Sequence, residues 1–280
     1  MSANQEPNRS ANPPGVTAYW SSAASERLIV VTPTYNEREN LAEFARRVWE
    51  AVPAAHILVV DDHSPDGTGE LAAELEREYA GRFFVLHREK KAGLGRAYVA
   101  GFRWALRQGY ELIAQMDADL SHDPAHLPAL VGAIRGHALV LGSRYLHGVN
   151  VINWEFKRLL LSKSASFYVR SVTGMPFSDP TGGYKCCRRE TLQAIDLDSL
   201  FATGYLFQVE TTFEAWRRGF AVAEAPIVFF ERKTGRSKMD RRVIREAAYG
   251  VLRIALRRLI PRYVVPLALP GAADQATAPR

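Results

Sequence analysis

Two carboxylates separated by one residue follow an apolar run near the middle of the chain. Residues 112–116 form this run, and Asp117 and Asp119 come directly after it. Carboxylate oxygens are the ligands that Mg²⁺ and Mn²⁺ prefer, and a divalent ion can neutralise the charge that develops on a diphosphate leaving group. An Asp-x-Asp pattern is common by chance, so its place at the end of a buried strand is what favours a metal and diphosphate site.

Two other interpretations compete for this segment. Ser121 or Asp123 precedes Pro124, and a Ser or Asp before proline is typical of a helix N-terminus. This capping role is compatible with a metal site. His122 and His126 are four residues apart, as zinc ligands on a helix would be, but no H-E-x-x-H pattern accompanies them. We therefore favour oxygen ligands over a zinc site.

Polar residues also follow other apolar runs. Asp61 and Asp62 come after residues 57–60, where a carboxylate can accept hydrogen bonds from a ribose or a base. Arg144 comes after residues 139–143, where its guanidinium can bind an anionic oxygen in bidentate fashion or form a surface salt bridge. Ligands of parallel sheets bind beyond the carboxyl ends of the strands. We therefore expect these side chains to line one cleft.

Two nucleotide-binding motifs are absent from the sequence. Residues 33–37, after the first apolar run, contain no G-x-G-x-x-G, which argues against a nicotinamide or flavin enzyme. No G-x-x-x-x-G-K-S/T pattern occurs, which argues against a P-loop. Gly93 and Gly95 can bring backbone N–H groups close to an anion, although this signal is weak by itself.

Short apolar runs alternate with segments of helical spacing between residues 28 and 143. This alternation predicts an α/β fold with a mostly parallel sheet and flanking helices. The predicted strands are residues 28–31, 57–60, 83–86, 112–116 and 139–143. The predicted helices are residues 41–52, a helix from about Thr68, and residues 95–108, 127–134 and 154–172. In the last of these, Leu159, Leu160 and Leu161 fit a lipid groove and a protein core equally well.

The 280 residues, 47% of them hydrophobic, are enough for one large globular domain. Residues 1–25 are rich in Ser, Asn, Pro and Ala and predict a disordered tail. Neither a signal peptide nor an uncharged apolar stretch of spanning length is found, so we expect a cytoplasmic protein. Cys186 and Cys187 are adjacent, which excludes a disulfide framework and suits small residues in a strand.

The positive charge is concentrated near the C-terminus. Residues 232–262 carry eleven Lys and Arg side chains but two acidic ones, whereas the whole chain has a net charge of +6. Residues 242–259 predict a basic amphipathic helix whose apolar face includes Ile244, Val251 and Leu259. The helix is expected to lie on an anionic membrane, or alternatively to pack on the sheet. We divide the chain into a tail (1–25), a catalytic domain (26–239), a membrane-surface helix (240–262) and a flexible tail (263–280).

Together, these ordered motifs resemble the polyprenol (dolichol) phosphate mannosyltransferases, which are family-2 glycosyltransferases with the A-type fold. The resemblance extends from about Leu28 to Met239. The matching blocks are residues 33–40, 60–68, 116–124, 142–145, 153–162, 179–184 and 232–238. Their order along the chain is far more specific than any single motif.

The resemblance implies a role for each matching residue. Residues implied to bind GDP-mannose are Pro33, Tyr35, Glu37, Val60, Asp62, Asp117, Ala118, Asp119, Arg232 and Lys238. Residues implied to bind the acceptor phosphate are Arg144, Arg158 and Ser162. Residues implied to bind Mg²⁺ or Mn²⁺ are Asp117, Asp119 and Ser121. Some family members carry Gln at the position of Ser121, and a serine oxygen is a weaker ligand. Asp119 and Arg144 are the expected catalytic residues.

The implied reaction is the transfer of mannose from GDP-mannose to a polyprenyl phosphate, with inversion. A phosphate monoester has a second pKa of about 6, so it is largely a dianion at neutral pH and needs arginines more than a general base. Glucose transfer from UDP-glucose to the same lipid is an alternative. A nucleic-acid-binding protein is disfavoured by the acidic strand ends. A non-catalytic module that only binds a sugar nucleotide is disfavoured by the intact acids, the arginines and the segment from Arg232 to Lys238. The expected partners are the membrane surface, peripherally on its cytoplasmic face, and a separate membrane-anchoring protein.

Overall fold

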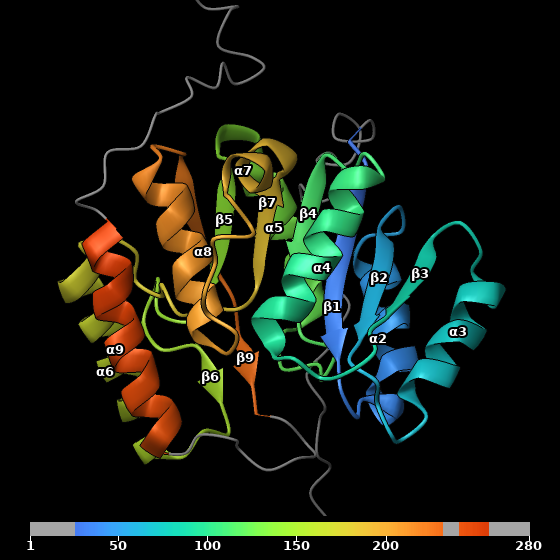
Figure 1. Ribbon diagram of the computed structural model, residues 1–280, viewed down its shortest axis with the longest axis horizontal. Helices are drawn as coiled ribbons and strands as arrows, with labels where there is room; N and C mark the ends of the chain where they lie inside the picture. The colour runs from blue at the N-terminus through green and yellow to red at the C-terminus, as the bar shows by residue number, and fades with distance from the viewer. Residues whose placement is uncertain (1–25, 232–240, 258–280) are drawn as a thin grey trace, which may run out of the picture.

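A seven-stranded sheet lies at the centre of the computed structural model, with helices on both of its faces (Figure 1). The structure describes residues 26–231 and 241–257. The strands of this sheet are β1 (Leu28–Thr34), β2 (His56–Asp61), β3 (Phe83–His87), β4 (Leu112–Gln115), β5 (Leu139–Ser143), β7 (Lys185–Arg188) and β8 (Val222–Pro226). The helices are α2 (Arg38–Ala51), α3 (Thr68–Glu78), α4 (Leu94–Arg107), α5 (Leu127–Ala133), α6 (Phe156–Thr173), α7 (Arg189–Ala194), α8 (Leu206–Arg217) and α9 (Arg241–Leu256). Two short 3₁₀ turns, η1 (Pro124–His126) and η2 (Ile134–Gly136), flank α5.

The strand order is β3-β2-β1-β4-β7-β5-β8. All five predicted strands are present, and β1, β2, β3 and β4 pair in parallel, which confirms the mostly parallel α/β fold. β7 pairs antiparallel with both β4 and β5, whereas β5 and β8 are parallel. The sequence did not predict β7, because Lys185 and Arg188 flank its two cysteines and conceal a buried strand. Cys186 and Cys187 are free, buried thiols in this strand, as expected for small strand residues.

Alternate residues of the central strands enter two separate cores. Ile29 and Val31 of β1 pack with α4 and α8 on one face, whereas Leu28 and Val30 pack with α2 and α5 on the other. A strand that is buried on both faces reads as a continuous apolar run, which explains why these strands were evident in the sequence. The rigid double layer places the carboxyl ends of β1, β2 and β4 at one edge.

A second sheet of two short strands adjoins this edge. β6 (Val151–Ile152) and β9 (Phe229–Phe230) pair in parallel, and an isolated bridge links His122 to Phe229. The backbone N–H of Phe230 also donates to the carbonyl oxygen of Ser121, at 3.2 Å. These bonds bring β9 against the loop that follows β4.

Helices α6 and α9 lie beside α8 at the β8 end of the sheet (Figure 1). Val251 and Ile254 of α9 are buried in the core that includes α8. This corrects the expectation that the apolar face containing Val251 rests on a membrane, because that face packs on protein. The part of the expected helix before residue 247 has no described side chains, and the part after residue 257 lies outside the described residues.

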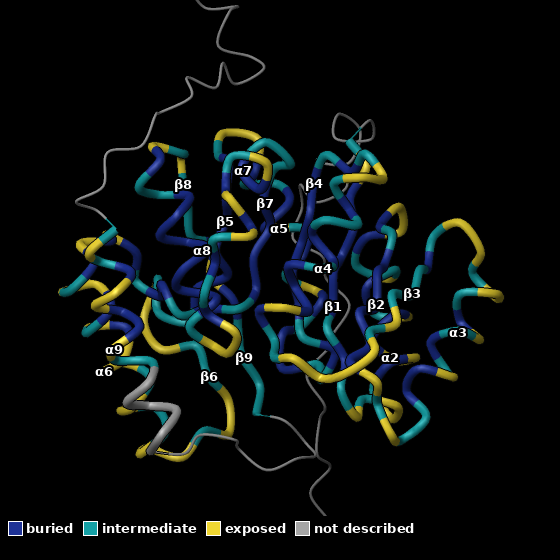
Figure 2. The backbone as a smooth tube through the Cα atoms, viewed as in Figure 1, coloured by how far each residue is buried: buried dark blue, intermediate teal, exposed yellow. Residues whose placement is uncertain are grey.

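Both α6 and α9 nevertheless have exposed positions (Figure 2), and several of these carry large apolar side chains. These side chains are Phe156, Leu160, Leu161 and Phe167 of α6 and Tyr249, Leu252 and Leu256 of α9. Leu160 and Leu161 are 57% and 38% exposed, so they do not belong to the core. Within residues 26–231 and 241–257, no helix combines the length and the apolar character needed to cross a membrane. We refer to these seven side chains as the apolar face of α6 and α9.

Candidate active site

The two acidic residues that follow β2 have different environments. Asp61 is buried, and its carboxylate accepts hydrogen bonds from the Thr34 hydroxyl and from the backbone N–H and hydroxyl of Ser64. Asp62 instead pairs with Arg88 and accepts a long bond of 3.4 Å from the Ala92 N–H. Asp61 therefore joins the turn after β2 to the end of β1, whereas Asp62 faces the loop after β3.

Burial raises the pKa of the Asp62 carboxyl, and the charge of Arg88 opposes part of that rise. Arg88 is half of a largely buried ion pair, because the two side chains are 18% and 7% exposed. Arg88 was not among the residues predicted from the sequence. It follows β3 directly, so its place after a strand was a usable signal.

The end of β1 and the short connection to α2 contain three of the predicted residues, Pro33, Tyr35 and Glu37. The Lys91 ammonium group lies 3.4 Å from the centroid of the Tyr35 ring, which joins the loops after β1 and β3. The Glu37 N–H donates to the hydroxyl of Thr68 at 3.0 Å. Pro33 is partly exposed at the end of β1. These residues and Asp62 therefore lie at one part of the sheet edge.

Val60 and Ala118 differ from the other predicted ligands because both are buried. The Val60 side chain is fully buried and lies in the core with α4, where a β-carbon placed on Gly101 would come within 3.0 Å of it. The Val60 side chain points into the core, so any contact with a nucleotide would have to come from its backbone, and the expected role of Val60 stays a prediction. Ala118 is 2% exposed, so its side chain is likewise enclosed.

The loop after β4 is closed by hydrogen bonds around Asp117 and Asp119. The backbone N–H of Asp117 donates to Nδ1 of His122 at 3.1 Å, and the buried Tyr98 hydroxyl donates to the Asp117 carboxylate at 3.4 Å. The backbone N–H of Ser121 donates to Oδ1 of Asp119 at 3.0 Å. These bonds hold both carboxylates within one tight turn.

The residues of this turn fit a hard divalent cation. The Ser121 hydroxyl oxygen is buried and has no hydrogen-bond partner among the described residues, which marks it as an oxygen that a ligand could satisfy. Asp117 and Asp119 supply two carboxylates to the same turn. Among the described residues, no cluster of three or more His, Cys, Asp and Glu side chains is arranged to hold a metal. A metal ion here would need further oxygens from a diphosphate or water.

The two alternative interpretations of this segment are resolved differently. The Asp123 carboxylate accepts from the Ala125 N–H at 3.0 Å and caps η1, so the predicted capping role is confirmed. The two histidines do not converge on a metal. His122 accepts from Asp117, and Nε2 of His126 accepts from the Val228 N–H at 3.0 Å. Both histidines thus bind backbone amides and organise loops.

Arg144 lies directly after β5 and forms a buried pair with Asp179. Its Nε and Nη2 donate to the two carboxylate oxygens at 2.6 and 2.7 Å, and Nη2 also donates to the Thr181 hydroxyl at 2.9 Å. Burial alone would raise the pKa of Asp179, but the charge and hydrogen bonds of Arg144 outweigh this effect and lower it. Arg144 is thus held rigidly by a partner 35 residues further along the chain.

The other two predicted acceptor residues lie near Arg144. The hydroxyl of Tyr145 donates to the Ser162 hydroxyl at 2.8 Å. The guanidinium carbons of Arg144 and Arg158 lie 5.6 and 4.3 Å from the centroid of the Trp154 ring. Arg158 also pairs with Glu231 at 2.8 Å. The structure therefore brings Arg144, Arg158 and Ser162 together around an aromatic wall.

Phe229 connects the acidic and the basic parts of the site. Its ring centroid lies 5.3 Å from that of His122 and 5.4 Å from that of Trp154, and the Arg144 guanidinium carbon lies 5.6 Å from it. Phe229 was not predicted from the sequence, because the adjacent pair Phe229 and Phe230 forms no distinctive motif. The acidic turn after β4 and the arginine group after β5 are thus two sides of one site. Arg232 and Lys238, the expected diphosphate ligands, lie outside the described residues.

Comparison with known proteins identifies the family of the chain. The profile described as Glycosyl transferase family 2 matches residues 29–196. The chain belongs to this family. Polyprenol monophosphomannose synthase of Mycolicibacterium smegmatis is 49% identical over 239 residues, which are 85% of this chain and 90% of that protein. Undecaprenyl-phosphate mannosyltransferase of Micrococcus luteus is 46% identical over 230 residues, which are 82% of this chain and 94% of that protein.

Solved structures support the same fold for this family-2 glycosyltransferase. Glucosyl-3-phosphoglycerate synthase from Mycobacterium tuberculosis, crystallised with Mn²⁺, UDP and phosphoglyceric acid, superposes with a TM-score of 0.64. The match covers 90% of this chain and 86% of that chain, at 18% sequence identity. At this identity the likeness establishes a shared fold, which is the glycosyltransferase A-type architecture predicted from the sequence.

Proposed function

We propose that the protein transfers mannose from GDP-mannose to a polyprenyl phosphate, giving a polyprenyl β-mannosyl phosphate and GDP. The observation that carries this proposal is the meeting of the acidic turn and the arginine group at Phe229. Such a site can receive a diphosphate leaving group on one side and a phosphate nucleophile on the other. The names of two relatives, each 46% identical or more over most of the chain, support mannose and a polyprenyl phosphate as the substrates.

The chemistry requires no general base from the protein. The acceptor phosphate is largely dianionic at neutral pH, so one of its oxygens attacks the anomeric carbon as the bond from that carbon to the diphosphate oxygen breaks. The single displacement inverts the configuration, and GDP carries away the electron pair. Arg144, Arg158 and Ser162 orient the acceptor phosphate and compensate its charge. Trp154 and Phe229 shield this site from water on one side.

We infer that the site uses a divalent cation, Mg²⁺ or Mn²⁺. Asp117 and Asp119 would hold it, with the buried hydroxyl of Ser121 as a third ligand. When bound, the ion neutralises negative charge on the diphosphate. On the donor side, Asp62 and Tyr35 would contact the base and ribose. Arg88 and Lys91 would hold these two side chains in position.

We also propose that the protein works at a membrane surface, through the apolar face of α6 and α9. Helix α6 links this face to the acceptor side, because it also carries Arg158 and Ser162. A monomer rarely exposes so many large apolar side chains on two neighbouring helices without a partner. The lipid acceptor supplies the reason for that partner to be a membrane. A membrane-anchoring protein and the cytoplasmic leaflet remain predictions from the sequence.

One assay tests the proposed function. Labelled GDP-mannose, and separately UDP-glucose, is mixed with the protein, a polyprenyl phosphate and Mg²⁺, and the label that enters the organic phase is counted. We expect mannose transfer and little glucose transfer, with a β-linked product. Transfer from UDP-glucose instead would assign the alternative donor, and no transfer from either donor would refute the proposal. An Asp119→Asn protein serves as the inactive control.

A further inference from the structure

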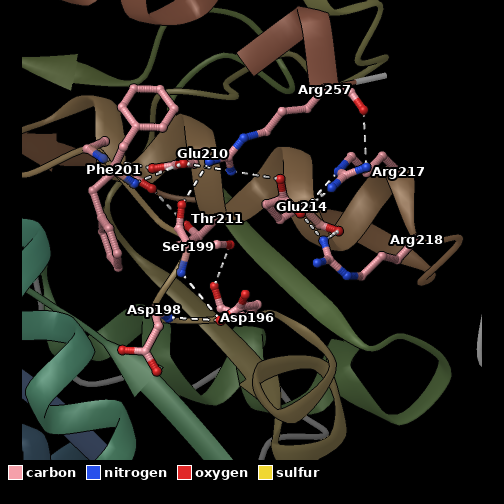
Figure 3. Close-up of polar contacts among 12 residues, drawn as sticks. Asp196, Asp198, Ser199, Phe201, Glu210, Thr211, Glu214, Arg217, Arg218 and Arg257 are labelled. Carbon is pink, nitrogen blue, oxygen red and sulfur yellow. Dashed lines mark hydrogen bonds and ion pairs between the residues drawn. The ribbon is translucent and has the colours of Figure 1, made fainter. Parts of the chain in front are cut away.

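Helix α9 is fastened to the catalytic domain by a buried ionic cluster, drawn in Figure 3. Glu210 and Glu214, one turn apart on α8, are almost completely buried. Nη1 of Arg257 lies 2.8 Å from Oε1 of Glu210 and 3.0 Å from Oε1 of Glu214. Arg217 and Arg218 pair with Glu214 alone among acidic side chains in the described part of the chain. Arg257 is thus the residue that joins both glutamates to the end of α9.

The same arginine holds the connecting segment 199–203, which lies between α7 and α8. Nη2 of Arg257 donates to the carbonyl oxygen of Ser199 at 2.8 Å. Glu210 accepts from the backbone N–H groups of Phe201 and Ala202, at 3.2 and 2.9 Å. The guanidinium carbon of Arg253 lies 4.0 Å from the centroid of the Phe201 ring. Segment 199–203 is therefore clamped between α8 and α9.

Segment 199–203 also packs against the start of α4. The Gly95 N–H donates to the carbonyl oxygen of Thr203 at 2.9 Å. A β-carbon on Gly95 would lie 2.3 Å from the carbonyl oxygen of Ala202, and one on Gly93 would lie 2.5 Å from that of Thr203. Because the two backbone segments pack so closely, neither segment can shift without the other. The position of segment 199–203 thus determines where α4 begins.

The residues just before α4 are those that contact the donor side. Arg88 pairs with Asp62, the Ala92 N–H donates to Asp62, and Lys91 lies over the ring of Tyr35. A continuous series of contacts therefore runs from the last turn of α9, through segment 199–203 and the start of α4, to the loop 88–93. It joins the helix that carries part of the exposed apolar face to the opposite, nucleotide side of the site.

We propose that Arg257 is a positioning residue for the donor site, which it controls by holding segment 199–203 against the start of α4. The proposal rests on the proposed function, because it takes Asp62 and Tyr35 to contact a nucleoside diphosphate. Arg257 itself touches no part of that region in the described contacts. Its loss should nevertheless weaken nucleotide binding, even without lipid.

The test compares Arg257→Met with Arg218→Met in the full-length protein. Both substitutions remove one arginine from the same buried cluster, but Arg218 bonds to Glu214 and not to segment 199–203. GDP binding with Mg²⁺ is measured by calorimetry, and amide hydrogen exchange is measured at residues 88–95 and 199–203. We expect Arg257→Met to raise the GDP dissociation constant about threefold or more and to speed exchange in both segments. Arg218→Met should leave GDP binding and exchange at residues 88–95 unchanged.

Steady-state kinetics and milder variants complete the test. The KM for the sugar nucleotide should rise in Arg257→Met more than kcat falls, and Arg257→Lys should restore part of the loss. If Arg257→Met does not fold, Glu210→Gln tests the same link, because it removes one of the two charge partners of Arg257 and keeps the side chain's shape. An unchanged GDP dissociation constant, or unchanged exchange at residues 88–95, overturns the proposal. If the unmodified protein does not bind GDP, the proposed donor fails, and the exchange comparison still decides whether Arg257 positions this loop.

Discussion

Asp179 receives three hydrogen bonds from Arg144, from its backbone N–H at 3.1 Å, from Nε at 2.6 Å and from Nη2 at 2.7 Å. The Asp179 carboxylate is fully buried, and Arg144 is 11% exposed. The arginine at the end of β5 is therefore already charge-compensated before any substrate arrives. Such a guanidinium is held in one orientation, which suits it to align an acceptor phosphate.

Asp179→Asn should remove the carboxylate charge that holds Arg144 in one orientation. The substitution leaves a buried guanidinium without its counter-ion, which costs about 3–5 kcal/mol of unfolding free energy. We expect the KM for polyprenyl phosphate to rise while GDP binding stays unchanged. Urea unfolding and steady-state kinetics measure the two effects. Glu43→Gln is the matched control, because Glu43 pairs with Arg46 on the exposed surface of α2 and contributes about 1 kcal/mol at most.

The same pair predicts a dependence of stability on pH. Arg144 lowers the pKa of Asp179 below its unfolded value of about 3.9. The stabilisation from this carboxylate is therefore complete above about pH 4 and is lost as the pH falls through the folded pKa. Unfolding of Asp179→Asn between about pH 4 and pH 2 should thus be less pH-dependent than that of the unmodified protein. Equal slopes would show that another group dominates acid unfolding.

Ser121→Ala should have opposite effects on the stability of the metal-free protein and on the stabilisation that a metal ion provides. The buried Ser121 hydroxyl has no hydrogen-bond partner among the described residues, and an unsatisfied buried hydroxyl costs about 1–3 kcal/mol. Removing it should raise the melting temperature of the metal-free protein and reduce the further rise that Mg²⁺ or Mn²⁺ causes. Thermal unfolding with and without each ion measures both effects. If the ion stabilises both proteins equally, Ser121 is not a ligand.

Sequence reasoning located the parts of the site that lie at strand ends. Asp117, Asp119 and Arg144 come at or near the end of short, mostly apolar runs, so the fold and the edge of the sheet could be inferred together. The partners of these residues could not be inferred, because Asp179 and Phe229 reach the site through tertiary packing over long sequence separations. The buried positions of Lys185 and Glu210 could not be inferred for a related reason, since a charged residue suggests the surface when its buried partner is not known.

Lys185 provides a second test of pH dependence. It is buried in β7, where Nζ donates to the Gln208 carbonyl oxygen at 2.6 Å and to the Thr211 hydroxyl at 3.1 Å. Burial lowers the pKa of Lys185 to about 7, whereas an unfolded lysine has a pKa of about 10.4. Between these values the unfolded chain binds the additional proton, so stability should rise with pH, by at most about 1.4 kcal/mol per pH unit. In Lys185→Met this contribution to the slope should disappear, and urea unfolding at pH 7 to 10 compares the two proteins.

The apolar face of α6 and α9 predicts how the protein partitions between water and membranes. Leu256 is 62% exposed on α9, and burying a leucine in a membrane contributes about 1.5–3 kcal/mol. Leu256→Glu replaces that gain with a charge that anionic lipids repel, so binding to vesicles containing anionic lipid should fall at least about tenfold in a sedimentation assay. Gln193→Glu, on the exposed surface of α7, adds the same charge away from this face and should bind as the unmodified protein does. If Leu256→Glu sediments with vesicles as the unmodified protein does, the face does not contact lipid.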